Sequence, residues 1–382
     1  MTVDPKRVTF WYLFALFFTA AVSETLLSPL FPLVRHDIHL RTADLALITG
    51  ALTLMTGIGN LAGGVIGVKR SDRVAVRLAA FFVAGGSLLT SISGNLSILI
   101  VGQMLIGGGS GLFFAPGLSS VSRLYEKNRG RAIASYGLAY SLGLAVASFC
   151  ANQIAPPWRV NYLLISIMAV CLSIKVPNLK ENVESVTIGL QKMAIQYSKN
   201  SSYRLALMCG VVAGTTHYLV IGLIPEAFVD RGETLALVTG LVGIGRLASM
   251  LGKYAAGWAF DRWGGPRSAQ AVMSLMLCFG FLVLALPPKL GLIPIIPFVC
   301  FTAMLFPISN AIVIGALPAK SSLGVGIYRA SLMISSAVLS VFFSIALRHF
   351  GTFPVMLWAL TIPAVGILFI RRSKLSPSNN IG

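Results

Sequence analysis

Long apolar segments fill most of this 382-residue chain, and they constrain its fold more than any other feature. A run of about 20 apolar residues is long enough to cross a bilayer as an α-helix. Only 11% of the residues are charged, whereas a soluble globular protein has about 25%. The sequence therefore predicts an integral membrane protein. It excludes a soluble enzyme, a disulfide-stapled secreted domain and a disordered chain.

Breaks rich in charge, proline or glycine divide the apolar sequence into twelve predicted helices. They span residues 8–34, 43–68, 76–94, 97–122, 131–154, 159–176, 205–228, 234–260, 268–287, 291–316, 321–347 and 352–370. The longest polar segment follows the sixth of these helices. We therefore predict an all-α membrane protein of two six-helix bundles, at 1–176 and 205–382, joined by a cytoplasmic loop at 177–204.

The net charge of +18 has a simple explanation in this topology. Twelve crossings put both termini on one side, and the loops of that side contain 21 Lys and Arg residues against 6 on the other. Cytoplasmic loops of membrane proteins have such an excess of cations. The charge thus predicts cytoplasmic termini in a cell membrane, and it gives no reason to expect a nucleic-acid partner.

The two predicted halves resemble each other at an offset of 193 residues. Gly64 in the second helix corresponds to Gly257 in the eighth, and Pro32 in the first helix corresponds to Pro225 in the seventh. Repeated halves of this kind are typical of secondary transporters, whose substrate site lies between the halves near the middle of the bilayer. Small residues also let helices pack closely, so each match taken alone has a structural explanation.

The segment after the eighth predicted helix resembles the G-x-x-x-D-R-x-G-x-[RK] signature of the major facilitator superfamily. Its residues are Gly257, Asp261, Arg262, Gly264 and Arg267. Between the fourth and fifth helices, Arg129 and Gly130 are similar to the R-G-x-A segment of that family. The resemblance implies a transporter that works by alternating access, in which these residues clamp neighbouring helix ends.

Three departures from the family pattern matter. In the first half Val68 stands where the signature has Asp, and Asp72 follows four residues later, so this clamp is predicted to be shifted or weak. Gln103 in the fourth helix occupies a place where proton-coupled members often have Arg. The fifth helix also lacks the Gly-Pro pair typical of drug/proton antiporters. These departures count against a standard multidrug exporter.

Ionisable side chains at membrane depth are costly, and they are functional candidates for that reason. Five side chains qualify here: Glu24, His217, Arg246, Lys253 and Arg329. Glu24 and His217 occupy equivalent positions of the repeat. Arg246 and Lys253 are seven residues apart and therefore lie on one face of the eighth helix.

This pattern predicts a cationic substrate site. Guanidinium forks match carboxylates, so Arg246 and Arg329 are predicted to bind a small anion, an organic carboxylate, with Lys253 as a third cation. Glu24 and His217 are the predicted proton carriers. Three alternatives stay open. Arg246 could form a structural ion pair, and Glu24 is one candidate partner for the cations of the eighth helix. Lys253 or Arg329 could extend toward the membrane surface, and His217 could be a core residue.

A weaker prediction places five further polar residues along the cavity: Asn60, Gln103, Tyr136, Tyr140 and Asn310. No metal ligand set, cofactor site or phosphate-binding loop is recognisable, so a gradient would supply the energy. We expect a monomer whose partners are a small-molecule substrate, a proton or another coupling ion, and the bilayer. The alternative function is a proton-coupled exporter of neutral or cationic drug-like molecules, because Glu24 would suit a cation.

Overall fold

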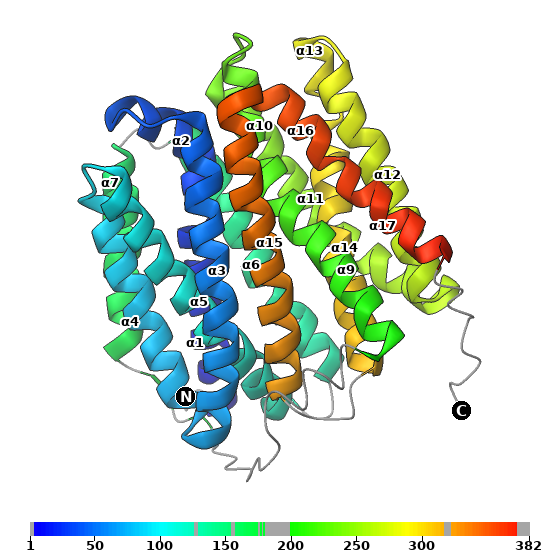
Figure 1. Ribbon diagram of the computed structural model, residues 1–382. Coiled ribbons are helices and arrows are strands. Elements are labelled where there is room, and N and C mark those ends of the chain that lie inside the picture. Colours follow the sequence, from blue (N-terminus) through cyan, green and yellow to red (C-terminus); the bar gives the residue numbers. More distant parts are fainter. Residues whose placement is uncertain are drawn as a thin grey trace.

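The computed structural model describes residues 4–125, 129–153, 157–174, 176–177, 179, 199–316 and 322–372, and nearly all of them are helical (Figure 1). Ten of its helices are long and apolar enough to cross a membrane. Two shorter apolar helices, at Ser135–Phe149 and Trp158–Ile174, cover the fifth and sixth predicted spans. The twelve predicted spans therefore all correspond to helical segments.

The first half contains the elements up to α7, and the second half contains those from α9 onward. The first-half elements are α1 (Pro5–Thr25), α2 (Leu27–Asp37), α3 (Thr42–Lys69), α4 (Asp72–Ser91), α5 (Leu96–Leu124), α6 (Arg129–Gln153) and α7 (Trp158–Ile174). The second-half elements are α9 (Ser201–Thr215), η2 (Thr216–Val220), α10 (Ile221–Val229), α11 (Leu235–Trp263), α12 (Gly265–Ala285), α13 (Pro288–Gly291), α14 (Ile295–Ala316), α15 (Ser322–Phe350), α16 (Thr352–Ala359) and α17 (Thr361–Arg372). The predicted central loop lies largely outside the described residues.

The helix starts reproduce the offset found in the sequence. The first residues of three helix pairs are each 193 positions apart: α3 and α11, α4 and α12, and α6 and α15. Figure 1 shows α2, α10 and α13 at one end of the bundle and the start of the chain at the other. We call these the outer and the inner end, because the sequence predicts the inner end to be cytoplasmic.

The first and seventh spans are broken rather than continuous. The sequence predicts one helix at 8–34, but α1 and α2 meet at a turn at Leu26. Pro29 has no N–H to donate to the carbonyl of Thr25, which explains the break. In the seventh span, the π-helical turn η2 precedes Pro225 in α10. Such turns frequently mark functional sites, and these two interruptions occupy equivalent places in the repeat.

The two halves meet where α3 packs against α15 and α6 packs against α11. Within the first half, α3 and α5 touch through their backbones: a Cβ added at Gly63 would lie 2.4 Å from the carbonyl oxygen of Leu112. A Cβ at Gly111 would lie 2.3 Å from the carbonyl oxygen of Thr56. Only glycine allows this separation, so the α3–α5 seam leaves no room for a methyl group.

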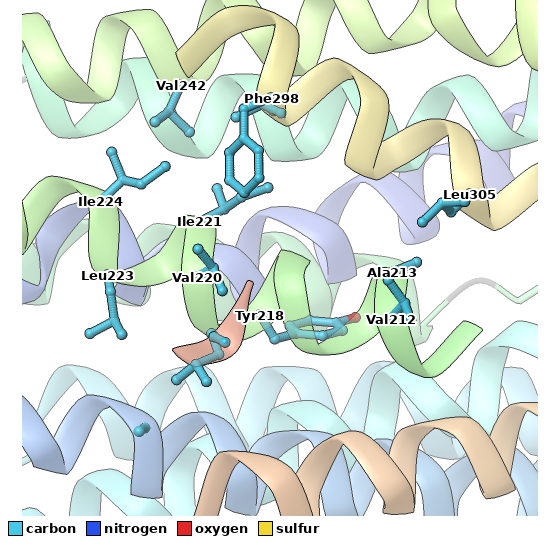
Figure 2. Close-up of a cluster of buried hydrophobic side chains, with 14 of the residues drawn as sticks. Val212, Ala213, Tyr218, Val220, Ile221, Leu223, Ile224, Val242, Phe298 and Leu305 are labelled. Atoms are coloured by element: carbon cyan, nitrogen blue, oxygen red, sulfur yellow. The ribbon is translucent and has the colours of Figure 1, made fainter. Parts of the chain in front are cut away.

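An apolar core surrounds the broken seventh span. Figure 2 shows side chains of α9, η2 and α10 close to Val242 of α11 and to Phe298 and Leu305 of α14. Phe298 and Leu305 are at most 1% exposed. The packing fixes η2 and thereby positions the two polar residues at its start, His217 and Tyr218.

Candidate functional site

A small cavity lies between the halves, beside the breaks in the first and seventh spans. Its polar lining includes Glu24, Gln103, His217, Tyr218 and Arg246, from α1, α5, η2 and α11. Its apolar wall is formed by Leu27, Leu45, Ile48 and Leu52. The volume of about 30 Å³ has room for about one water molecule, so the site is narrow in this structure.

Arg246 brings a buried positive charge to the cavity. Its side chain is 3% exposed, and one terminal nitrogen donates to the carbonyl of Leu144 at 2.8 Å and to Ser148 Oγ at 2.7 Å. The Nε–H has no partner. Among the described residues Arg246 forms no ion pair, so its charge is held by neutral groups of α6 rather than by a carboxylate of the protein.

Glu24 lines the same cavity but accepts a hydrogen bond from a hydroxyl group. Tyr218 Oη donates to Glu24 Oε1 at 2.7 Å, and the hydroxyls of Tyr218 and Tyr140 are 3.1 Å apart. This row of hydrogen-bonded groups, Tyr140, Tyr218 and Glu24, connects the two halves, because α1 and α6 belong to the first half and η2 belongs to the second. Within the part of the chain that the structure describes, Glu24 is not ion-paired with Arg246 or Lys253.

Two further cavity groups lack a hydrogen-bond partner. His217 is 5% exposed, packs edge-on against the rings of Tyr218 and Phe306, and leaves its Nε2 without a partner. Gln103 is fully buried and leaves its Oε1 unpartnered. A buried polar group without a partner is unfavourable, so both atoms are suited to a bound ligand.

The other two predicted cations lie away from the cavity. Lys253 donates a hydrogen bond to Ser141 on α6, nearer the inner end than the contacts of Arg246. The guanidinium of Arg329 on α15 sits 4.0 Å from the ring centre of Phe114 on α5, and its Nε has no partner. The structure therefore separates Arg246 from the other two members of the predicted cationic set.

Of the five weaker cavity predictions, the structure places only Gln103 on the cavity wall. Tyr140 reaches the cavity indirectly, through Tyr218. Asn60 donates to the carbonyl of Thr56 on its own helix at 2.8 Å, while Tyr136 stacks on an aromatic ring 4.7 Å away. Asn310 is half-buried on α14. Our sequence reasoning missed Tyr218, although it stands in a polar run, residues 215–218, within an apolar span.

The signature segment of the second half lies at the surface of the inner end. Asp261, Arg262 and Arg267 are exposed, as is Gly257, and the guanidinium of Arg262 lies 5.3 Å from the ring centre of a tryptophan. Gly264 has φ +77°, which favours glycine and allows the sharp turn from α11 into α12. The surroundings of Arg129 and Gly130 are outside what the structure describes, so the role of these two residues stays a prediction.

In the first half, Asp72 makes the contacts of a clamp. It begins α4, is 6% exposed, and forms an ion pair with Arg123 near the end of α5. Ser119 and Ser120 donate to the same carboxylate at 3.0 and 3.1 Å. The clamp is therefore present but displaced by four residues from the position of Val68 in the signature, and it joins α4 to α5.

Ion pairs connect the two halves at the outer end. Arg35 on α2 pairs with Glu226 on α10, and its other nitrogen lies 3.5 Å from Asp230. Thr42 Oγ1 donates to Glu226 Oε1 at 3.1 Å. A second inter-half pair joins Arg348 to Asp44 at 3.7 Å. Both pairs hold the outer ends of the two halves together.

We expect Glu226→Gln to open the outer end more often. Arg35 is 32% exposed, so the pair contributes about 1 kcal/mol, equivalent to about a fivefold change in population. The measurement is the labelling rate of a cysteine at Ser28, which lines the cavity, by a membrane-impermeant reagent in a cysteine-free background. Asp37→Asn is the matched control, because Asp37 pairs with Arg159 inside the first half at 2.8 Å. Equal rates in both variants would contradict the prediction.

Comparison with known proteins gives a consistent result. The family model described as Major Facilitator Superfamily matches residues 13–303. The nitrite extrusion protein of Bacillus subtilis is 24% identical over 70% of this chain and 68% of its own length. The sialic acid transporter NanX of Escherichia coli is 24% identical over 66% of this chain and 65% of its own length.

The crystal structure of a D-xylose-proton symporter superposes with a TM-score of 0.72 at 16% identity, covering 95% of this chain and 96% of that one. This likeness shows the fold, and the family model extends over most of the chain, including both broken spans. The described helices also account for all twelve spans of a multi-pass membrane protein. The chain therefore belongs to the major facilitator superfamily, and it is a secondary transporter rather than an enzyme.

Proposed function

We propose that this protein carries a small organic carboxylate across the membrane by alternating access, with protons as the coupling ion. One observation carries the proposal: Arg246 is buried at a cavity between the halves, and no carboxylate among the described residues neutralises it. A buried charge without a counter-ion is costly. A carboxylate ligand supplies both the missing charge and an acceptor for the free Nε–H of Arg246.

Lys253 and Arg329 have a different place in this proposal. They lie away from the closed cavity, on helices that form the contacts between the halves. We assign them to the inner part of the substrate path, where they attract the anion as the inner end opens.

Glu24 and His217 are the proposed proton carriers. Both line the cavity, and they sit at equivalent places in the two broken spans. The hydroxyl chain from Tyr140 through Tyr218 to Glu24 exists only while the halves are together. Movement of the halves therefore changes the surroundings of the carboxyl group, which is the requirement for coupling its proton to transport.

The names of the relatives agree with transport but do not choose a substrate. They include nitrite and sialic acid, which are anionic at neutral pH, and D-xylose, which is an uncharged sugar. The buried Arg246, which has no ion-pair partner among the described residues, supports a carboxylate. A cationic or neutral drug-like substrate remains the second candidate, because Glu24 is a cavity carboxylate without an ion-pair partner in the described ranges. We place the protein in the cytoplasmic membrane as a monomer, with both termini inside.

A ligand-stabilisation screen tests the proposal. Small carboxylates, sugars and lipophilic cations are added to the detergent-solubilised protein, and the thermal unfolding midpoint is recorded. A ligand present at 100 times its Kd stabilises the folded state by about 2.7 kcal/mol. We expect carboxylates to raise the midpoint and to exchange across proteoliposomes. Stabilisation by lipophilic cations alone would favour the exporter, and stabilisation by sugars alone would exclude both functions.

A further inference from the structure

We propose that the cavity selects a short carboxylate with a hydroxyl group on the neighbouring carbon, and that Gln103 recognises this hydroxyl. The inference rests on the proposed function, since Arg246 is taken to hold the carboxylate. Gln103 comes from α5 in the first half and Arg246 from α11 in the second, and both line the same cavity. A ligand that touches both residues therefore joins the two halves.

The amide of Gln103 is held in place and yet incompletely bonded. Its Nε2 lies 3.4 Å from Thr90 Oγ1 and 3.3 Å from Tyr162 Oη, on α4 and α7. Its Oε1 has no partner, although the residue is fully buried. Two hydroxyls thus orient the amide while its other atom stays free. A ligand group that bonds this atom removes an unfavourable unpaired acceptor.

A hydroxyl group fits this position better than the alternatives. It both donates and accepts, so it can bond the free amide atom and also the unpartnered Nε2 of His217, whichever tautomer the imidazole adopts. A methyl group satisfies neither atom. An ammonium group also donates, but it would place a second positive charge beside the buried Arg246, which has no ion-pair partner among the described residues.

The size of the ligand follows from the rest of the wall. Leu27, Leu45, Ile48 and Leu52 close the cavity with aliphatic side chains. The cavity of about 30 Å³ must widen to admit any carboxylate, and a compact ligand needs the least widening. A hydroxyl on the carbon next to the carboxylate keeps both polar groups within a compact molecule. The site therefore points to a short 2-hydroxycarboxylate.

The test compares three probes with one carbon skeleton: propionate, lactate and alanine, whose second carbon carries hydrogen, hydroxyl or ammonium. Binding to the full-length protein is measured by thermal stabilisation, and transport by exchange in proteoliposomes. We expect lactate to bind at least about 10-fold more tightly than propionate, because the hydroxyl satisfies buried polar groups. In Gln103→Leu, this ratio should fall below about twofold while propionate binding is kept.

Ser87→Ala is the matched control. Ser87 is fully buried in the same half as Gln103, its hydroxyl is bonded to that of Ser23 at 2.9 Å, and it is not part of the cavity lining, so the lactate preference should persist. Equal binding of lactate and propionate to the unmodified protein overturns the inference and leaves the proposed function standing. Tightest binding of alanine overturns it as well and assigns recognition to Glu24. If no carboxylate binds, the proposed function itself fails. An unchanged ratio in Gln103→Leu removes Gln103 from the recognition role.

Discussion

Replacing Arg246 with alanine is expected to reduce carboxylate transport about 100-fold. The charged hydrogen bonds that a guanidinium gives a carboxylate are worth up to about 3 kcal/mol, which corresponds to about 100-fold in binding. The loss should be large here because the residue is only 3% exposed, so water cannot replace the guanidinium. Exchange of labelled carboxylate in proteoliposomes measures the effect, with the protein content of the vesicles matched.

Two variants separate the ligand role of Arg246 from a structural one. Arg246→Lys keeps the charge but loses the planar fork, so we expect a partial defect. Ser148→Ala removes one of the two acceptors that orient the guanidinium and should cost no more than about fivefold, the effect of a single hydrogen bond. If Arg246→Ala transports carboxylates as well as the unmodified protein, the proposed site is wrong. If Ser148→Ala is equally inactive, Arg246 acts by joining α6 to α11 instead.

Replacing Asp72 with asparagine is expected to destabilise the protein by about 3 kcal/mol. The carboxylate is buried and accepts from Arg123 and from two serines, so its removal leaves a half-buried guanidinium without a counter-ion. Asp72 also begins α4, where a negative charge is favourable to the helix dipole. The free energy of unfolding in detergent, obtained by chemical denaturation, gives the comparison.

Asp261→Asn is the matched control for Asp72→Asn. Asp261 is the acid of the signature in the second half, but it is exposed and forms no ion pair with any residue that the structure describes. Its replacement should change stability by less than about 0.5 kcal/mol, as is usual for surface positions. If Asp261→Asn lowered the free energy of unfolding more than Asp72→Asn does, the clamp of the first half would not be the one that stabilises this structure.

The twelve spans were predictable because length and apolarity alone determine a membrane-crossing helix. The position of the interruptions was not fixed by hydropathy: the polar residues Ser23, Glu24 and Thr25 all belong to α1, and the break follows from the missing N–H of Pro29. The repeat offset did place the interrupted segments in register, since Pro32 and Pro225 correspond. Local chemistry therefore determined the helices and their breaks.

The composition of the cavity was only partly predictable. The seven-residue spacing correctly puts Arg246 and Lys253 on one face, and both contact α6. Spacing along a helix does not show which side chains reach a cavity, so the sequence predicts Lys253 and Arg329 in one cationic set with Arg246. The contact between Tyr218 and Glu24 joins residues 194 positions apart. Tertiary packing determines such pairs, and a single sequence contains no signal for them.

The glycine seam between α3 and α5 has a consequence for how motion in this protein can be followed. Because the two backbones touch at Gly63 and Gly111, these helices cannot slide or separate without breaking dense contacts along their length. The separation of a probe pair with one probe on each helix should therefore stay constant through the transport cycle. Such a pair provides a constant reference distance. Changes in the distance between probes on α3 and α15 can then be assigned to movement of one half relative to the other.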